Sequence, residues 1–135
     1  MKKSQRSAIG KLATKIKTKE FVTKDSGKRQ DFPSGMRRDT QDDKPNFRFL
    51  LVPDMPFEEQ MLTRWANLMV RGAKKYGEYN FTKANSEEEL ERFKASALRH
   101  MLQYQCGDES EDHGASVMFN VMAAEMVKWK LKNRR

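Results

Sequence analysis

SEEELERFKASALRHMLQYQCGDESEDHGASVMFN, residues 86–120, is the stretch that decides the fold. Ser86 is followed three residues later by Glu89, which is the capping box that begins many helices. Apolar residues then recur every three or four positions, as on the buried face of a helix: Leu90, Phe93, Ala97, Met101 and Tyr104. Gly107 follows this series and suits a helix end. The sequence therefore predicts a helix from Ser86 to Gly107.

Two further helices flank this one. The next begins between Asp108 and His113 and ends in the basic C-terminal tail, whose charge complements the helix dipole. An earlier helix is expected to have Asp54 as its N-cap and Pro56 in its first turn, and to end near Gly77. Three amphipathic helices with short connections, and no alternating strand pairs, predict an all-α fold built as a small helical bundle.

The N-terminal third of the chain has a different composition. Residues 1–45 contain 13 Lys and Arg against 6 Asp and Glu, and few large apolar side chains. We therefore expect residues 1–31 to form a basic, disordered arm, and residues 32–135 to form the folded domain. Apolar residues at helical spacing within the arm leave a short basic amphipathic helix as the alternative. At the start of the domain, the apolar run 47–52 is expected to be extended or strand-like.

Length and composition limit the class of protein. A chain of 135 residues is enough for one domain with a modest core. The single cysteine excludes an internal disulfide. The longest apolar runs are too short to cross a membrane, and no signal-peptide pattern opens the chain, which favours the cytoplasm. The net charge of +8 makes an anionic partner the expected one, whether nucleic acid, nucleotide or membrane surface.

The connection between the last two predicted helices is unusually acidic. It holds four carboxylates within five positions: Asp108, Glu109, Glu111 and Asp112. Hard divalent cations prefer oxygen ligands and commonly bridge carboxylates to substrate phosphates. Glu109 and Asp112 are three residues apart and can share one helix face, and Glu88 and Glu91 repeat this spacing on the preceding helix. A divalent metal site is one interpretation; stabilisation of a helix N-terminus is the other.

Both histidines of the chain flank this connection. His113 and Asn120 are two helical turns apart and therefore project from the same side of the last helix, while His100 lies on the helix before it. Two histidines facing one cleft could bind a metal or contact phosphate. The alternative is that each is a hydrogen-bonded packing residue.

A cationic cluster follows the apolar face of the first predicted helix. Arg71 and Lys75 are four residues apart and lie on one side of it, and Tyr76 and Asn80 lie at the turn that follows. Such a cluster can neutralise phosphate, and a tyrosine can stack on a base, although a solvated helix end has the same pattern. Neither glycine-rich phosphate loop, GxxxxGK[ST] or GxGxxG, is present.

Five motifs in order carry a resemblance to a known family: SGMRRD (34–39), DKPNF (43–47), RGAKKYGEYNF (71–81), ALRHMLQY (97–104) and GDESEDHGASVMFN (107–120). This order resembles the phage dATP/dGTP diphosphohydrolase family. The residues that match its motifs are Arg38, Lys44, Arg71, Lys75, Tyr76, Asn80, His100, Asp112, His113 and Asn120. The chain departs from the pattern at three positions, with Asp43 in place of glycine, Phe81 in place of tryptophan and Asp108 in place of glutamate.

The resemblance implies an all-α nucleotide hydrolase similar in style to the MazG-type pyrophosphohydrolases, which cut a nucleoside triphosphate between its α and β phosphates. The expected reaction is hydrolysis of a purine deoxynucleoside triphosphate to monophosphate and pyrophosphate, with Mg²⁺, Mn²⁺ or Co²⁺ as cofactor. Pairing of subunits is implied as well, so a homo-oligomer is expected. A non-catalytic accessory protein that binds nucleic acid through residues 1–31 is the alternative, followed by a helical assembly protein.

The roles implied by the resemblance fall into three groups. The expected metal ligands are His100, Glu109, Asp112 and His113, with Asp108 or Glu109 left open as the first carboxylate. Glu111 or Glu91 is expected to orient the attacking water. The expected substrate-binding residues are Arg38, Lys44, Arg71, Lys75, Tyr76, Asn80 and Asn120. The preferred base and the identity of the metal stay open.

Overall fold

The computed structural model of the protein describes residues 20–134. The chain divides into two compact units, one on each side of the bond between Asn46 and Phe47. In the first unit, β1 (Arg29–Asp31) pairs with β2 (Arg37–Asp39) as an antiparallel hairpin. Most of the expected disordered arm, residues 1–19, lies outside the described residues.

The hairpin was not predicted, because its strands are only three residues long and have no apolar alternation. Its turn is closed by the amide of Gly35, which donates to the carbonyl oxygen of Phe32 at 2.9 Å, and Gly35 adopts a φ of 91° that favours glycine. Across the strands, Arg37 Nε lies 2.7 Å from Asp31 Oδ1. The hairpin is thus joined by main-chain bonds and opposite charges, and it spans the boundary expected between residues 31 and 32.

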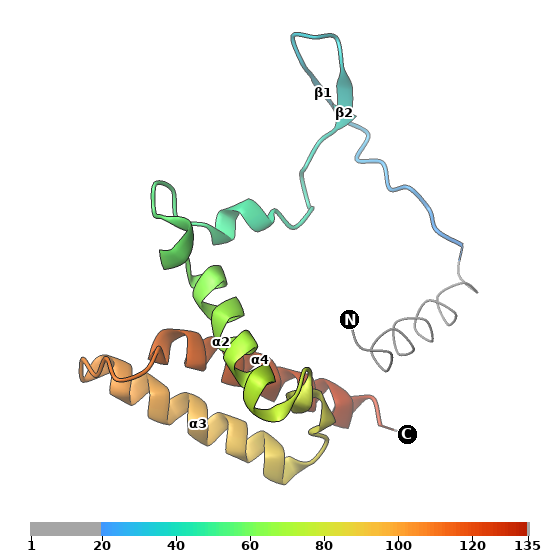
Figure 1. Ribbon diagram of the computed structural model, residues 1–135. Coiled ribbons are helices and arrows are strands. Elements are labelled where there is room, and N and C mark those ends of the chain that lie inside the picture. Colours follow the sequence, from blue (N-terminus) through green and yellow to red (C-terminus); the bar gives the residue numbers. More distant parts are fainter. Residues whose placement is uncertain (1–19, 135) are drawn as a thin grey trace. The chain divides into compact units, whose positions relative to one another are not determined.

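The second unit is helical, in agreement with the predicted all-α bundle. Its elements are η1 (Phe47–Leu50), η2 (Phe57–Glu59), α2 (Met61–Tyr76), η3 (Asn80–Lys83), α3 (Glu87–Gln105) and α4 (His113–Lys132). Helices α3 and α4 run side by side, and α2 packs against α4 (Figure 1). Within residues 20–134, no helix is both long enough and apolar enough to cross a membrane.

The predicted start of α3 and the predicted glycines at the ends of α2 and α3 are confirmed. Ser86 Oγ accepts a hydrogen bond from the amide of Glu89 at 3.2 Å, and the Glu89 carboxylate accepts one from the amide of Asn85 at 3.0 Å. This is the predicted capping box. Gly77 and Gly107 end α2 and α3 with φ values of 94° and 76°, which a residue with a side chain rarely adopts.

The segment before α2 differs from the prediction. Residues Phe47–Leu50 form a 3-10 helix rather than an extended run. Asp54, expected as an N-cap, has a left-handed φ of 65°; Pro56 caps η2 instead, and Gln60 precedes α2. The prediction was wrong here because this segment is held by a side chain that follows it in the sequence.

That side chain is the buried amide of Gln60. Its Oε1 accepts from the amide of Val52 at 2.9 Å, and its Nε2 donates to the carbonyl oxygens of Val52 and Met55, both at 2.8 Å. One side chain thus satisfies three main-chain groups of the loop. The loop that contains Val52 and Met55 is therefore hydrogen-bonded to Gln60 at the start of α2, and it does not pair as a strand.

The core lies where α3 and α4 meet. Buried Leu90 from α3 packs with Ala124 and Val127 from α4 and with Ala84, which precedes α3. Phe119 from α4 joins further elements: its ring meets that of Phe81 edge to face at 5.5 Å between centroids and that of Phe93 at 6.2 Å. The first half of α4 is thereby packed against η3 and α3.

Candidate functional site

The two histidines form a buried pair. His100 from α3 and His113 from the first turn of α4 are 8% and 2% exposed, and their Nδ1 atoms lie 2.8 Å apart. His113 Nε2 is hydrogen-bonded to the carboxylate of Asp108, which also accepts from the hydroxyl of Ser110 at 2.6 Å. Gly107 and the connection after it join the end of α3 to the start of α4, and the two rings meet beside this connection.

The donors and acceptors of this pair follow from its neighbours. Arg99 can only donate, so its Nη2, 3.4 Å from His100 Nε2, makes that nitrogen an acceptor. His100 then carries its proton on Nδ1 and donates to Nδ1 of His113, which in turn donates from Nε2 to Asp108. Burial, followed by the charge of Arg99, lowers the pKa of His100, which fits this neutral form.

Asp108 is held as an anion at the end of this chain of hydrogen bonds. The bond from Ser110 is the largest cause that lowers its pKa, and the bond from His113 is the next. A carboxylate that accepts from a histidine fixes the orientation and tautomer of the ring, as is common behind metal-binding histidines. Asp108 therefore lies where it can orient His113.

Among residues 20–134, one group of side chains has the spacing of a metal site. His100, Glu111 and His113 each offer a ligand atom, and these atoms lie within 4.8 Å of one another. Two buried imidazoles and one exposed carboxylate suit Mn²⁺ or Co²⁺ better than Mg²⁺, which prefers oxygen ligands throughout. The structure thus brings together two of the expected ligands with Glu111, which was expected to orient water.

The other expected metal ligands lie outside this group. Glu109 is exposed. Asp112 accepts from Arg64 Nε at 2.9 Å and Arg64 Nη2 at 2.6 Å, and it caps α4 by accepting from the amide of Ala115 at 3.1 Å. These bonds use three of the roughly four acceptor positions of the carboxylate. Asp112 joins α2 to α4, and its role as a metal ligand stays a prediction.

The charge of Asp112 is stabilised from α2. The hydrogen bonds from Arg64 are the largest cause that lowers the pKa of Asp112, and Arg71 contributes through its charge. Glu91, the second residue expected to orient water, is exposed on α3 and pairs with Lys94 at 2.9 Å. It is not among the side chains grouped with the histidines.

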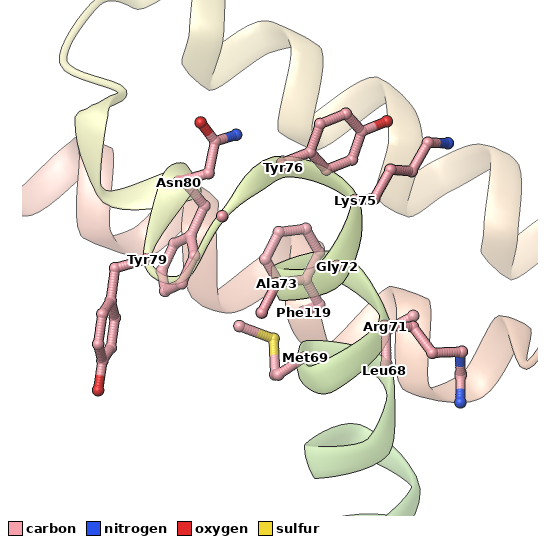
Figure 2. Close-up of a pocket in the computed structure, with 12 residues that line it drawn as sticks. Leu68, Met69, Arg71, Gly72, Ala73, Lys75, Tyr76, Tyr79, Asn80 and Phe119 are labelled. Carbon is pink, nitrogen blue, oxygen red and sulfur yellow. The ribbon is translucent and has the colours of Figure 1, made fainter. Parts of the chain in front are cut away.

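A pocket of about 300 Å³ collects four of the expected substrate-binding residues: Arg71, Lys75, Tyr76 and Asn80. It lies at the end of α2, against η3 and α4, and the rest of its lining is mostly apolar. In Figure 2, the side chains of Lys75, Tyr76 and Asn80 stand along one edge of the pocket, and the guanidinium of Arg71 extends outward at the side. The pocket therefore combines a cationic rim with an apolar interior.

The remaining expected substrate-binding residues lie elsewhere. Asn120 is buried on α4, where its Nδ2 donates to the carbonyl oxygen of Ser116 at 2.8 Å, and it lines a different hollow, between α3 and α4. Arg38 and Lys44 belong to the first unit. There, Lys44 Nζ lies 3.1 Å from Asp39, which also binds the amide of Ser26.

Comparison with protein families identifies a match over most of the chain. The family described as dATP/dGTP diphosphohydrolase, N-terminal, matches residues 35–135. The chain belongs to this family. No curated protein and no solved structure matches the chain.

Two residues near the site were not predicted from the sequence, and only the first of them carried a local signal. Arg64 precedes Arg71 by seven residues and therefore shares its face of α2, so a partner for the acidic connection could have been sought there. Phe119 lies beside Asn120 and reaches the pocket from α4. Its importance comes from the packing of α4 against α2, which no local pattern shows.

Proposed function

We propose that the protein hydrolyses purine deoxynucleoside triphosphates to the monophosphate and pyrophosphate with the help of a divalent metal ion. The observation that carries this proposal is membership of the dATP/dGTP diphosphohydrolase family over residues 35–135. The grouped side chains of His100, Glu111 and His113, close to an acidic connection in a basic chain, support it.

In this proposal, His100, Glu111 and His113 hold the metal ion, and Nδ1 of His113 binds it in place of the hydrogen bond that it accepts from His100. Mn²⁺ or Co²⁺ suits these ligands best. The bound ion supplies Lewis-acid polarisation of the phosphate and a water of lowered pKa. Glu109 and Asp112 remain proposed as additional ligands, Asp112 through its remaining acceptor position. Because a carboxylate has two oxygens, Glu111 can bind the metal with one and orient a water with the other.

The rest of the site positions the substrate. Arg71 and Lys75 at the pocket rim neutralise charge on the triphosphate, which is what hydrolysis at phosphorus most needs from a protein. Asp108 keeps the ring of His113 oriented through its hydrogen bond to Nε2. Arg64 holds Asp112 in place, so the start of α4, which carries His113, stays against α2.

The test uses the full chain and measures pyrophosphate release from each of the four deoxynucleoside triphosphates with Mg²⁺, Mn²⁺ or Co²⁺. We expect release from the purine substrates, fastest with Mn²⁺ or Co²⁺. Glu111→Gln should lower kcat on the order of 100-fold without changing the melting temperature, because Glu111 is exposed. Glu125→Gln is the matched control: Glu125 is exposed on α4 and pairs only with Lys128 among its charged neighbours in the described chain.

A second readout tests the metal site apart from turnover. Titration with Co²⁺, followed by the visible absorption of the bound ion, should show saturable binding that Glu111→Gln weakens at least about tenfold. The proposal is wrong if no substrate releases pyrophosphate with any of the three ions. Salt-sensitive binding of DNA by the same inactive protein would then favour the nucleic-acid-binding alternative.

A further inference from the structure

Gly72 lies in the fourth turn of α2 and lines the pocket. Its backbone is helical, a conformation that every residue except proline adopts readily, and glycine lowers helix stability relative to alanine. Apart from its two chain neighbours and the nearby backbone of its own helix, a Cβ atom placed there would meet no heavy atom of the described chain within 4 Å. Neither the backbone nor the packing of residues 20–134 explains a glycine at this position, so the open space it leaves is itself a feature of the pocket.

The pocket interior is built to hold an apolar, flat group. Leu68 and Met69 line it from α2, and Phe81 and Phe119 line it from η3 and α4. The ring of Phe119 is fixed by its edge contacts with Phe81, at an interplanar angle of 86°, and with a second phenylalanine on α3. A volume of about 300 Å³ is at the lower end of pockets that bind small ligands.

The pocket rim adds charge and hydrogen-bonding groups. Arg71 and Lys75 are exposed on one side of α2, and Lys75 Nζ lies 5.1 Å from the centre of the Tyr76 ring. Asn80 is exposed beside them and brings an amide that can both donate and accept. Cations at the mouth of an apolar cavity are complementary to a ligand with an anionic end and an apolar end, as in a nucleotide (Figure 2).

We propose that this pocket takes the purine base of the nucleotide. The base lies in the space left by Gly72, against the ring of Phe119, and Asn80 contacts its polar edge. Arg71 and Lys75 then face the phosphates outside the pocket. This inference rests on the proposed function for the identity of the ligand, but binding of a base does not require hydrolysis.

The test fills the pocket without removing any contact. Gly72→Leu places a large side chain into the open space from a helical position, so folding should be retained and the melting temperature equal or higher. Binding is measured by calorimetry with dAMP and dGMP, which carry a base, and with inorganic tripolyphosphate, which does not. We expect Gly72→Leu to lower the affinity for both nucleotides at least about tenfold and to leave the affinity for tripolyphosphate unchanged. Val70→Leu is the matched control: Val70 lies on the same helix, is exposed and does not line the pocket, so this variant should bind all three ligands like the wild type.

Three results would overturn the inference that the pocket takes the base. Equal binding of dAMP and dGMP by the wild type and Gly72→Leu places the base elsewhere, and so does an absence of nucleotide binding by the wild type. A Gly72→Leu protein that changes from oligomer to monomer in light scattering shows instead that the pocket receives a second copy of the chain. If nucleotide binding is lost as expected while the wild type releases no pyrophosphate, only the proposed hydrolysis fails.

Discussion

Asp112 shows how one side chain serves fold and site together. It caps α4, it binds Arg64 on α2 through two hydrogen bonds, and it directly precedes His113. Replacing Asp112 by alanine would remove a cap, an ion pair and a proposed metal ligand in one step, and loss of activity would have three explanations. Changing Arg64 instead isolates the ion pair.

Arg64→Met should lower the free energy of unfolding by about 1–2 kcal/mol at pH 7, because the ion pair is only partly exposed and its hydrogen bonds are charge-assisted. The pKa of Asp112 lies below its ordinary value of 3.8, chiefly because of Arg64. The stabilisation is therefore complete above pH 3.8 and is lost as the pH falls through the lowered pKa. Urea denaturation at pH 7 and pH 3 measures the free energy of unfolding of the variant and of the wild type. The difference between these two free energies should be smaller at pH 3 than at pH 7.

Lys94→Met is the matched control for this prediction. Lys94 and Glu91 form an exposed pair at 2.9 Å on α3, and exposed pairs of this kind contribute little stability. The free energy of unfolding of Lys94→Met should stay close to that of the wild type at both pH values. A deficit of Arg64→Met that is the same at pH 3 as at pH 7 would show that lost packing, and not the charge of Asp112, causes it.

The site residues that sequence could predict are those set by helical spacing. Arg71 and Lys75 are four residues apart and line one pocket, and His100 and His113 meet because each lies at the end of a helix that borders the same connection. The choice between Asp108 and Glu109 as the first carboxylate could not be made in this way. These residues lie in the non-helical connection, where the side-chain direction depends on how the loop turns.

At the scale of the elements, α3 has the most complete local signal. The Ser86 hydroxyl accepts from the amide of Glu89 in the first turn, and the Glu89 carboxylate accepts from the amide of Asn85, which precedes the helix. Because these bonds are local in sequence, the start of α3 could be predicted from two residues. The start of α2 could not, because the amide of Gln60 holds a loop that precedes it.

Ser86→Ala should lower the free energy of unfolding by about 1 kcal/mol, since the amide of Glu89 loses its acceptor. Ser96→Ala, at the middle of the same helix, should slightly raise the free energy of unfolding, because alanine has the higher helix propensity. Urea denaturation followed by circular dichroism at 222 nm measures both. A Ser86→Ala protein as stable as Ser96→Ala would show that the capping box does not stabilise the start of α3.

At the scale of the whole molecule, charge and chemistry are separated along the sequence. Residues 1–19 contain seven Lys and Arg and no acidic residue, whereas the histidine pair and the pocket lie in the helical unit after Asn46. The family match begins at residue 35. The basic arm therefore lies outside the part of the chain that the family shares, and its role can be tested by truncation.

Deleting residues 1–19 should leave pyrophosphate release within about twofold of the full chain, because the proposed catalytic groups all lie in the second unit. The same deletion should weaken binding to duplex DNA and flatten its dependence on salt, since each lysine or arginine that pairs with a phosphate releases about 0.9 of a counterion. Fluorescence anisotropy of a labelled duplex between about 50 and 200 mM salt measures that slope.

Deleting residues 1–31 is the informative comparison for the first unit. It also removes β1 and Ser26, so Asp39 loses the amide it binds and the hairpin cannot form, while Lys44 keeps its carboxylate partner. If Arg38 and Lys44 bind the triphosphate, as the family resemblance implies, this longer deletion should raise KM more than the shorter one. It should leave kcat nearly unchanged, because the proposed metal ligands are untouched. Equal KM values for the two truncations would mean that the hairpin does not organise a substrate contact, and a collapse of kcat in the shorter one would mean that residues 1–19 take part in the site itself.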